Sequence, residues 1–200
     1  MSRNAYTPNF DGRNALILHR PHPVVDAIKR QLAQLGIRCE TRWPELSASS
    51  VEDADLLFFD ADMGHDEQFP WTHGEAPMPA IALIGSEAPG RLAWAIRLGA
   101  DAHLLKPVGS GGVFTALVIA SEAFVKRLAM RAELDGLRSR LEQREVIAEA
   151  TACLMLQANL PAEVAYARLR REAMAARLTI EAMAERIVHE LRAGHVHHRT

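Results

Sequence analysis

The sequence predicts an α/β domain built on a five-stranded parallel sheet, then a long coiled-coil helix and a C-terminal three-helix bundle. Over residues 15–107, short apolar runs alternate with stretches of helical periodicity, which is typical of βα units. From Ser121 to Ala158 there is no proline, and Gly136 is the only glycine, so this stretch favours one long helix. Asn159-Leu160-Pro161 then interrupts the chain before two shorter helical patterns.

Five apolar runs have the length of strands, and helical spacing separates most of them. The predicted strands cover residues 15–18, 37–43, 55–60, 80–84 and 102–105. The predicted helices cover residues 23–35, closed by Gly36, residues 91–98, and about residues 113–123. Together these elements predict five βα units.

Composition is typical of a soluble globular protein. Of the 200 residues, 48% are hydrophobic and 24% are charged, and no run of apolar residues is long enough to span a membrane. The polar N-terminus lacks the apolar core of a secretory signal. Cys39 and Cys153 lie far apart and suggest neither a disulfide framework nor a zinc site. We therefore expect a cytoplasmic protein with no cofactor, no bound metal and no membrane partner.

Two motifs in the first half resemble the receiver domain of response regulators. The run from Asp55 to Asp60 is similar to the strand that ends in the phosphoacceptor aspartate, and the run from Leu98 to Pro107 is similar to the last strand with its lysine–proline pair. The resemblance implies a flavodoxin-like receiver fold over residues 13–122. It places Asp60 at the phosphoacceptor position and Lys106 at the position of the phosphate-contacting lysine.

The same region departs from the receiver pattern where the metal would bind. Mg²⁺ requires carboxylate oxygens, which the family supplies as an acid pair after the first strand. Here that place holds His19-Arg20. The family also has a hydroxyl side chain at the end of the fourth strand, and here that position is occupied by Ile84 or Gly85. The sequence therefore predicts a pseudo-receiver that aspartyl phosphate does not switch, in which Asp60 and Lys106 form a vestigial site.

Several carboxylates of this region have a simpler interpretation than metal binding. Asp60 is expected to bond to loop amides or to pair with Lys106 at the end of its strand. Asp62, Asp66 and Glu67 lie in a Gly/His/Pro-rich loop, which favours a solvated turn over a replacement metal cluster.

An apolar stripe in the long helix predicts a homodimer. The stripe follows alternating spacings of four and three residues and comprises Met130, Leu134, Leu137 and Leu141. So narrow an apolar face on a long helix needs a partner, so residues 123–143 are predicted to form a parallel coiled coil. The alternative is a single linker helix packed back on the receiver.

The last fifty residues contain four short motifs in a fixed order. They are Ala150 to Met155 (ATACLM), Ala165-Tyr166, Leu169-Arg170 and Ala173-Met174. This order resembles the ANTAR domain, an RNA-binding module of bacterial transcription antiterminators, over residues 144–193. Thr151 and Ala152 stand where the family pattern has lysine and glycine, which puts the phosphate contact of that lysine in doubt.

Recognition of RNA hairpins uses phosphate contacts and stacking on unpaired bases, so arginines and an aromatic side chain are the candidate contacts. The candidate RNA-binding residues are Arg144, Tyr166, Arg168, Arg170, Arg171 and Arg177. Some of these arginines are expected to pair with neighbouring glutamates. Met155, Met174 and Met183 are expected in the core, and Thr179 is expected to cap a last helix that ends at Gly194. Residues 194–200 are expected to form a disordered tail, in which His195, His197 and His198 bind no metal.

The order of pseudo-receiver, coiled coil and ANTAR domain resembles that of ANTAR transcription antiterminators. The resemblance implies a non-enzymatic regulator that binds hairpins of a leader mRNA and prevents formation of a terminator. It also implies a negative regulator that senses a ligand, resembles a periplasmic binding protein and sequesters the antiterminator. Two alternatives stay open: a phosphorylation-dependent response regulator, and a DNA-binding transcription regulator with a helix-turn-helix.

Overall fold

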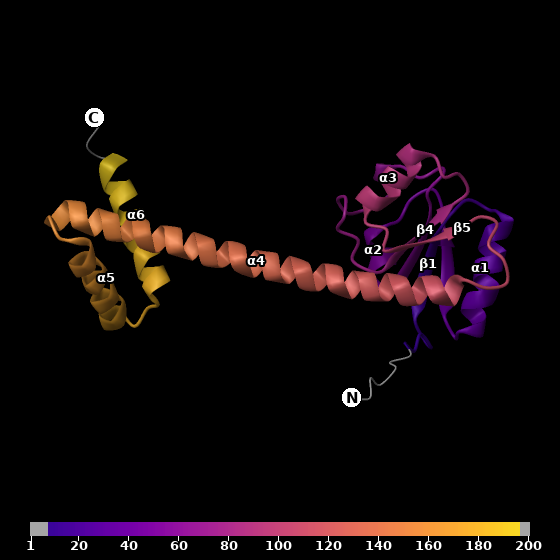
Figure 1. Ribbon diagram of the computed structural model, residues 1–200, viewed down its shortest axis with the longest axis horizontal. Coiled ribbons are helices and arrows are strands. Elements are labelled where there is room, and N and C mark those ends of the chain that lie inside the picture. The colour runs from indigo at the N-terminus through magenta and orange to yellow at the C-terminus, as the bar shows by residue number, and fades with distance from the viewer. Residues whose placement is uncertain (1–7, 197–200) are drawn as a thin grey trace. The chain divides into compact units, whose positions relative to one another are not determined.

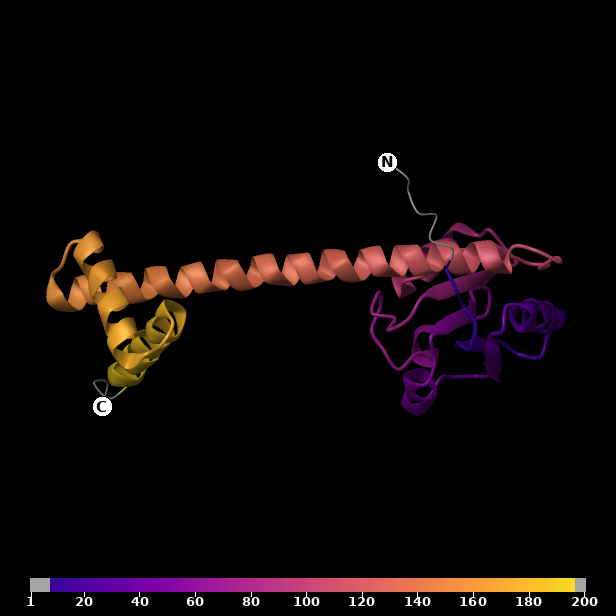
Figure 2. The same cartoon turned by 90° about the horizontal axis from the view of Figure 1, so that it is seen from below.

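A computed structural model describes residues 8–196 of the chain, and it describes side chains as far as Glu190. The chain divides into two compact units, residues 1–129 and residues 130–200. Helix α4 (Val113–Ala158) is one uninterrupted helix that contributes to both units (Figure 2). In the part of the chain covered by the structure, no helix is both long enough and apolar enough to cross a membrane.

The first unit is built on a parallel sheet with the strand order β2-β1-β3-β4-β5. Figure 1 labels β1, β4 and β5 of this sheet. The strands are β1 (Asn14–Leu18), β2 (Arg38–Arg42), β3 (Leu56–Asp60), β4 (Ala80–Ile84) and β5 (Ala102–Leu105). The helices are α1 (Pro23–Gln34), α2 (Ala48–Glu52), α3 (Pro89–Leu98) and the first part of α4. The predicted five-stranded receiver-like fold is thus confirmed.

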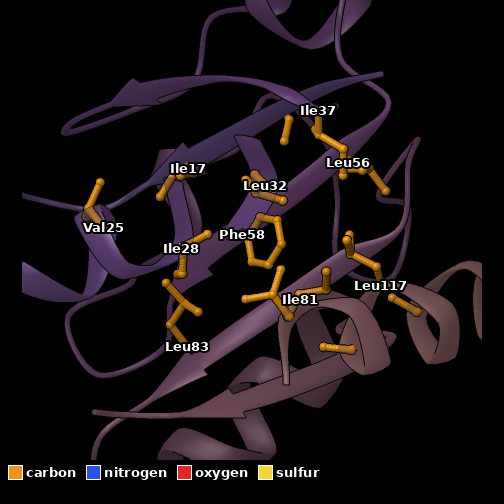
Figure 3. Packing of buried hydrophobic residues seen from close by; sticks show 14 of the residues in the cluster. Ile17, Val25, Ile28, Leu32, Ile37, Leu56, Phe58, Ile81, Leu83 and Leu117 are labelled. Carbon is orange, nitrogen blue, oxygen red and sulfur yellow. The ribbon is translucent and has the colours of Figure 1, made fainter. Parts of the chain in front are cut away.

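The sheet is covered on both faces, as the apolar sequences of its inner strands require. Every residue of β3 and β4 is buried. On one face, Ile28 of α1 and Leu117 of α4 pack against Phe58 of β3 (Figure 3). On the other face, Trp94 of α3 packs against Phe59. Successive side chains of β3 therefore anchor helices on opposite faces, which fixes a three-layer arrangement.

Two connections in this unit differ from the prediction of five regular βα units. The connection from β3 to β4 contains only a 3₁₀ turn, η1 (Asp66–Gln68), because its glycines and prolines do not sustain a helix. The connection from β2 to β3 contains α2, which was not predicted. Ser47 caps α2 by accepting a hydrogen bond from the amide of Ser50, and none of its residues is buried.

The second unit is a three-helix bundle made of the last part of α4, α5 (Ala162–Ala176) and α6 (Ile180–Val196). Its core holds residues from all three helices: Ala150, Leu154, Ala165, Leu169, Ala173, Met183, Ala184, Ile187 and Val188. The predicted cap is confirmed, since the Thr179 hydroxyl accepts a hydrogen bond from the amide of Ala182 at 3.2 Å. The short Ala165 and Ala173 side chains let the helices approach closely around Leu169.

Two predictions about this bundle were wrong. Met174 is 62% exposed, because its neighbour Ala173 occupies the buried face of α5 and the next residue points about 100° away. Helix α6 continues past Gly194 to Val196, since one glycine in a helix is tolerated. Of the predicted tail, residues 197–200, with His197 and His198, lie outside the described residues, as does the side chain of His195.

Candidate functional site

Side chains from three strand ends meet at one edge of the sheet, where parallel strands of an open α/β sheet place their sites. Asp60 ends β3, His19 follows β1 and Lys106 follows β5. The Lys106 Nζ atom lies 2.8 Å from Oδ1 of Asp60, and Nε2 of His19 lies 3.3 Å from Oδ2. The predicted pairing of Asp60 with Lys106 is therefore present, and only 2% of the Asp60 side chain is exposed.

The residue that joins this group of side chains, called the receiver pocket below, from the end of β1 is His19, and the side chain of the adjacent Arg20 stays outside it. His19 is buried, whereas Arg20 is exposed and contributes its carbonyl oxygen, which lies 2.7 Å from His19 Nδ1. Because a carbonyl only accepts, Nδ1 carries the proton and donates. In the neutral ring Nε2 then accepts, and it lies 3.5 Å from Lys106 Nζ.

Asp62 also belongs to the pocket, although it was predicted to be part of a solvated turn. Its Oδ2 atom lies 2.6 Å from Lys106 Nζ and accepts a hydrogen bond from the Gly85 amide at 2.8 Å. Its Oδ1 atom accepts from the Ser86 amide at 2.9 Å. The only feature of the sequence that points to Asp62 as part of this pocket is its position two residues after the end of β3.

The other acids of that loop stay outside the pocket. Asp66 accepts a hydrogen bond from the Trp94 indole at 2.7 Å and pairs with His73 at 3.0 Å. Glu67, 84% exposed in its side chain, pairs with His65, as expected of a solvated turn.

The pocket does not fit Mg²⁺, which takes oxygen ligands in a near-octahedral array. Both of its carboxylates, those of Asp60 and Asp62, are bound to the ammonium group of Lys106. The third side chain facing Asp60 is the imidazole of His19. A cationic side chain thus lies between the carboxylates, where a second cation would be repelled.

We expect the stability of the protein to depend on pH through His19. Burial, the largest effect, lowers the pKa of its imidazole below the ordinary value, against the opposing effects of the hydrogen bond to Arg20 and the charge of Asp60. Lys106 and His22 also face the ring and lower its pKa. Since the unfolded chain takes up this proton at a pH of about 6.5, stability is fully present above that pH and falls as pH drops below it.

Urea unfolding of wild type and His19→Gln at pH 7.5 and pH 5.5 measures this dependence. The wild type is expected to lose up to about 1.4 kcal/mol per pH unit through this proton, and the variant is expected to lack that part of the loss. His103→Gln, at an exposed position of β5, is the control. An unchanged pH dependence in His19→Gln would contradict the assignment.

The candidate RNA-binding residues of α5 divide into exposed and paired side chains. Tyr166, Arg170 and Arg171 lie on one exposed face that forms a shallow hollow, and this face is also lined by Glu163, Val164, Ala167 and Met174. Tyr166 and Arg170 are four residues apart and so neighbours on the helix surface. Among the described residues, neither Arg170 nor Arg171 takes part in an ion pair.

The remaining candidates lie elsewhere on the unit. Arg168 donates from Nε to Oε1 of Glu172 at 2.8 Å, the kind of pair that was expected for some arginines. Arg144 is exposed on α4. Arg177 ends α5 in a left-handed conformation with a φ of 56°, and its amide donates to the carbonyl oxygens of Ala173 and Met174.

Arg177 occupies a backbone position that glycine adopts without strain, so Arg177→Gly is expected to stabilise the bundle by about 0.5–1 kcal/mol. Hydrogen exchange of the α5 amides would measure this gain. Arg170→Gly, which removes the same side chain inside the helix, is the matched control and is expected to destabilise α5 by about 1 kcal/mol. Equal losses in both variants would show that the Arg177 side chain stabilises the turn.

The predicted seam residues of α4 are all exposed in the single chain. Met130 is 65%, Leu134 48%, Leu137 52% and Leu141 61% exposed. Among the described residues, the core of the C-terminal bundle does not include this stripe.

Fold and pocket together define a receiver-like domain in which Lys106 is bound to Asp60 and Asp62 of the same chain. The family described as "AmiR, N-terminal" matches residues 13–121, which is more than half of the chain, so the chain belongs to this family. The ANTAR domain matches residues 135–188, starting within the predicted coiled-coil segment. The predicted resemblance to ANTAR antiterminators is confirmed.

Other known proteins resemble this chain in sequence or in fold. The aliphatic amidase regulator of Pseudomonas aeruginosa is 26% identical over 174 residues, covering 86% of this chain and 88% of that protein. Among solved structures, ShkA Rec1 in complex with c-di-GMP is 22% identical, with a TM-score of 0.41 over 57% of this chain and 94% of its own. A response regulator from Thermotoga maritima is 16% identical, with a TM-score of 0.45, and the match covers 55% of this chain and 98% of that protein. The family matches and the amidase regulator support a transcription antitermination regulator.

Proposed function

We propose that this protein binds hairpins of a leader mRNA as a homodimer and prevents formation of the terminator, under the control of a ligand-sensing partner protein. The proposed parts are a pseudo-receiver (13–122), a coiled coil (123–143) and an RNA-binding domain (144–193). The observation that carries the proposal is the exposed face of α5, in the region matched by the ANTAR domain. There an aromatic ring lies beside two arginines that form no ion pair with any described residue.

This face has the chemistry that an RNA loop requires. The guanidinium groups of Arg170 and Arg171 are exposed and free of internal ion pairs among the described side chains, so binding a phosphate breaks no existing bond. Tyr166 is 45% exposed and can stack on an unpaired base. Arg168 contributes less to binding, because it must first leave Glu172. Arg177 at the end of α5 and Arg144 on α4 are further exposed cations of the same unit.

Dimerisation follows from the seam on α4. The exposed apolar side chains of Met130, Leu134, Leu137 and Leu141 repeat along one face of the helix, and the seam of a second copy would cover them. Two linked RNA-binding domains then bind a two-hairpin leader with an avidity that a single domain lacks.

Control by a protein partner, not by aspartyl phosphate, is supported by the receiver pocket. Lys106 is bound to Asp60 and Asp62, and His19 stands where the acid pair would bind Mg²⁺. A sequestering protein that binds its inducer can release the regulator without any covalent change in this chain. The implied partner resembles a periplasmic binding protein.

The test is binding of the purified full chain to a two-hairpin leader RNA from upstream of its own operon, across a series of salt concentrations. Tight and salt-sensitive binding is expected, with weaker binding to the same sequence with unpaired stems and to duplex DNA. Preferential binding to duplex DNA would replace the proposal with a DNA-binding regulator. Binding that requires Mg²⁺ and a phosphoryl donor would replace it with a phosphorylation-dependent response regulator.

A further inference from the structure

The carboxylate of Asp62 is surrounded by three hydrogen-bond donors from distant parts of the chain. Lys106 Nζ lies 2.6 Å from Oδ2, the Gly85 amide donates to the same oxygen at 2.8 Å, and the Ser86 amide donates to Oδ1 at 2.9 Å. An ammonium group beside two successive backbone amides is a typical arrangement for binding an oxyanion.

Gly85 provides the space that this carboxylate occupies. A Cβ atom at position 85 would lie 2.8 Å from Oδ2 of Asp62 and 3.3 Å from Cε of Lys106, so a larger residue would displace the carboxylate. Gly85 is also one of the two positions where the receiver resemblance places a hydroxyl. The carboxylate thus takes up room that a side chain at the end of β4 would otherwise fill.

The surrounding charges favour the ionised form of Asp62. Burial raises the pKa of its carboxyl group, but the hydrogen bonds from Lys106, Ser86 and Gly85 together lower the pKa by more than burial raises it. The pKa therefore lies below its ordinary value. The Asp62 amide in turn donates to Oδ1 of Asp60 at 3.0 Å, which ties the carboxylate to the end of β3. Asp62 is therefore held through both its backbone amide and its side-chain carboxylate.

We propose that Lys106 and the amides of Gly85 and Ser86 form an oxyanion site of the kind that would hold a phosphoryl group, and that the carboxylate of Asp62 fills it permanently. The segment that joins β4 to α3 is then fixed by an anion belonging to the chain itself. In a signalling receiver, the anion arrives only on phosphorylation, whereas here it is present from folding onward. This inference does not depend on RNA binding, so it can fail while the RNA-binding part of the proposed function stands.

The test is to empty the site and refill it with an anion. In the full-length Asp62→Gly variant, the amide protons of Gly85 and Ser86 are expected to exchange at least about 10-fold faster than in wild type, because each loses a charge-assisted hydrogen bond. Inorganic phosphate or acetate is expected to restore slow exchange and to raise the Tm of the variant saturably. Chloride at equal ionic strength and the Glu67→Gly variant, which removes an exposed acid of the same loop, are the controls.

Two results would overturn the proposal. One is exchange in Asp62→Gly at the wild-type rate, and the other is faster exchange that phosphate and acetate correct no better than chloride. If the variant does not fold, NMR titration of the wild type decides instead. The Gly85 and Ser86 amide signals are expected to shift with the same midpoint as the Asp62 carboxyl carbon, and independence of the two would refute the site.

Discussion

Replacing Leu134 and Leu141 by glutamate is expected to convert the protein from a dimer into a monomer. Both leucines are exposed on α4 in the single chain, by 48% and 61%, and both belong to the proposed seam. Fully burying a leucine contributes about 1.5–3 kcal/mol, and about half of each side chain is still exposed, so covering each leucine contributes about 1 kcal/mol and the four leucines of a dimer about 4 kcal/mol. Their loss corresponds to a dimer dissociation constant about 10³-fold higher, before repulsion between the glutamates is added.

Sedimentation equilibrium of the full chain at micromolar concentration measures this change. The matched control is Ala132→Glu with Ser139→Glu, two exposed positions that lie about 160° around the helix from Leu134 and Leu141. This control is expected to remain a dimer. A monomeric wild type, or a control that dissociates as readily as the seam variant, would refute the coiled coil.

The seam variant also separates dimerisation from RNA recognition. Its substitutions lie outside α5, so binding to a single hairpin is expected to stay unchanged. Binding to the two-hairpin leader is expected to weaken, because the second domain is no longer linked to the first.

The strands and the packed helices were predictable because their side chains repeat with the period of the element. In β3 and β4 every residue is apolar up to the terminal Asp60, and both strands are buried throughout. In α5, Ala165, Leu169 and Ala173 recur every four residues and form the buried face. Helix α2 escaped prediction for the opposite reason: it has five residues and buries none of them, so it leaves no apolar periodicity.

The receiver pocket was predictable only in part, because it is assembled from strand ends that are distant in sequence. The resemblance to receivers assigned Asp60 and Lys106 to one site, and the pairing of these two residues was expected from that assignment. Nothing in the loop after β3 indicates that Asp62 turns toward Lys106 while Glu67 faces solvent. The choice between His19 and Arg20 likewise depends on which of two adjacent side chains points inward, and sequence alone left that choice open.

Changing Arg170 and Arg171 together to alanine is expected to weaken binding to the leader RNA by about 10- to 100-fold at moderate salt, since two charge-assisted contacts are lost. Alanine is the best helix former, and both side chains are exposed, so α5 is expected to keep its structure. If each arginine neutralises one phosphate, the slope of log K against log salt becomes shallower by about 1.4 for single-stranded RNA.

The control removes the same number of charges from another part of the chain. Arg138→Ala with Arg140→Ala takes two exposed arginines from α4, and once its dimeric state is verified it is expected to bind RNA nearly as wild type does. Tyr166→Ala separates stacking from charge, because it is expected to weaken binding without altering the salt slope. Equal weakening by both arginine pairs would mean that general positive charge, not the exposed face of α5, attracts the RNA. A selective loss with a shallower slope would assign Arg170 and Arg171 to the phosphates, and a loss at constant slope in Tyr166→Ala would assign Tyr166 to a base.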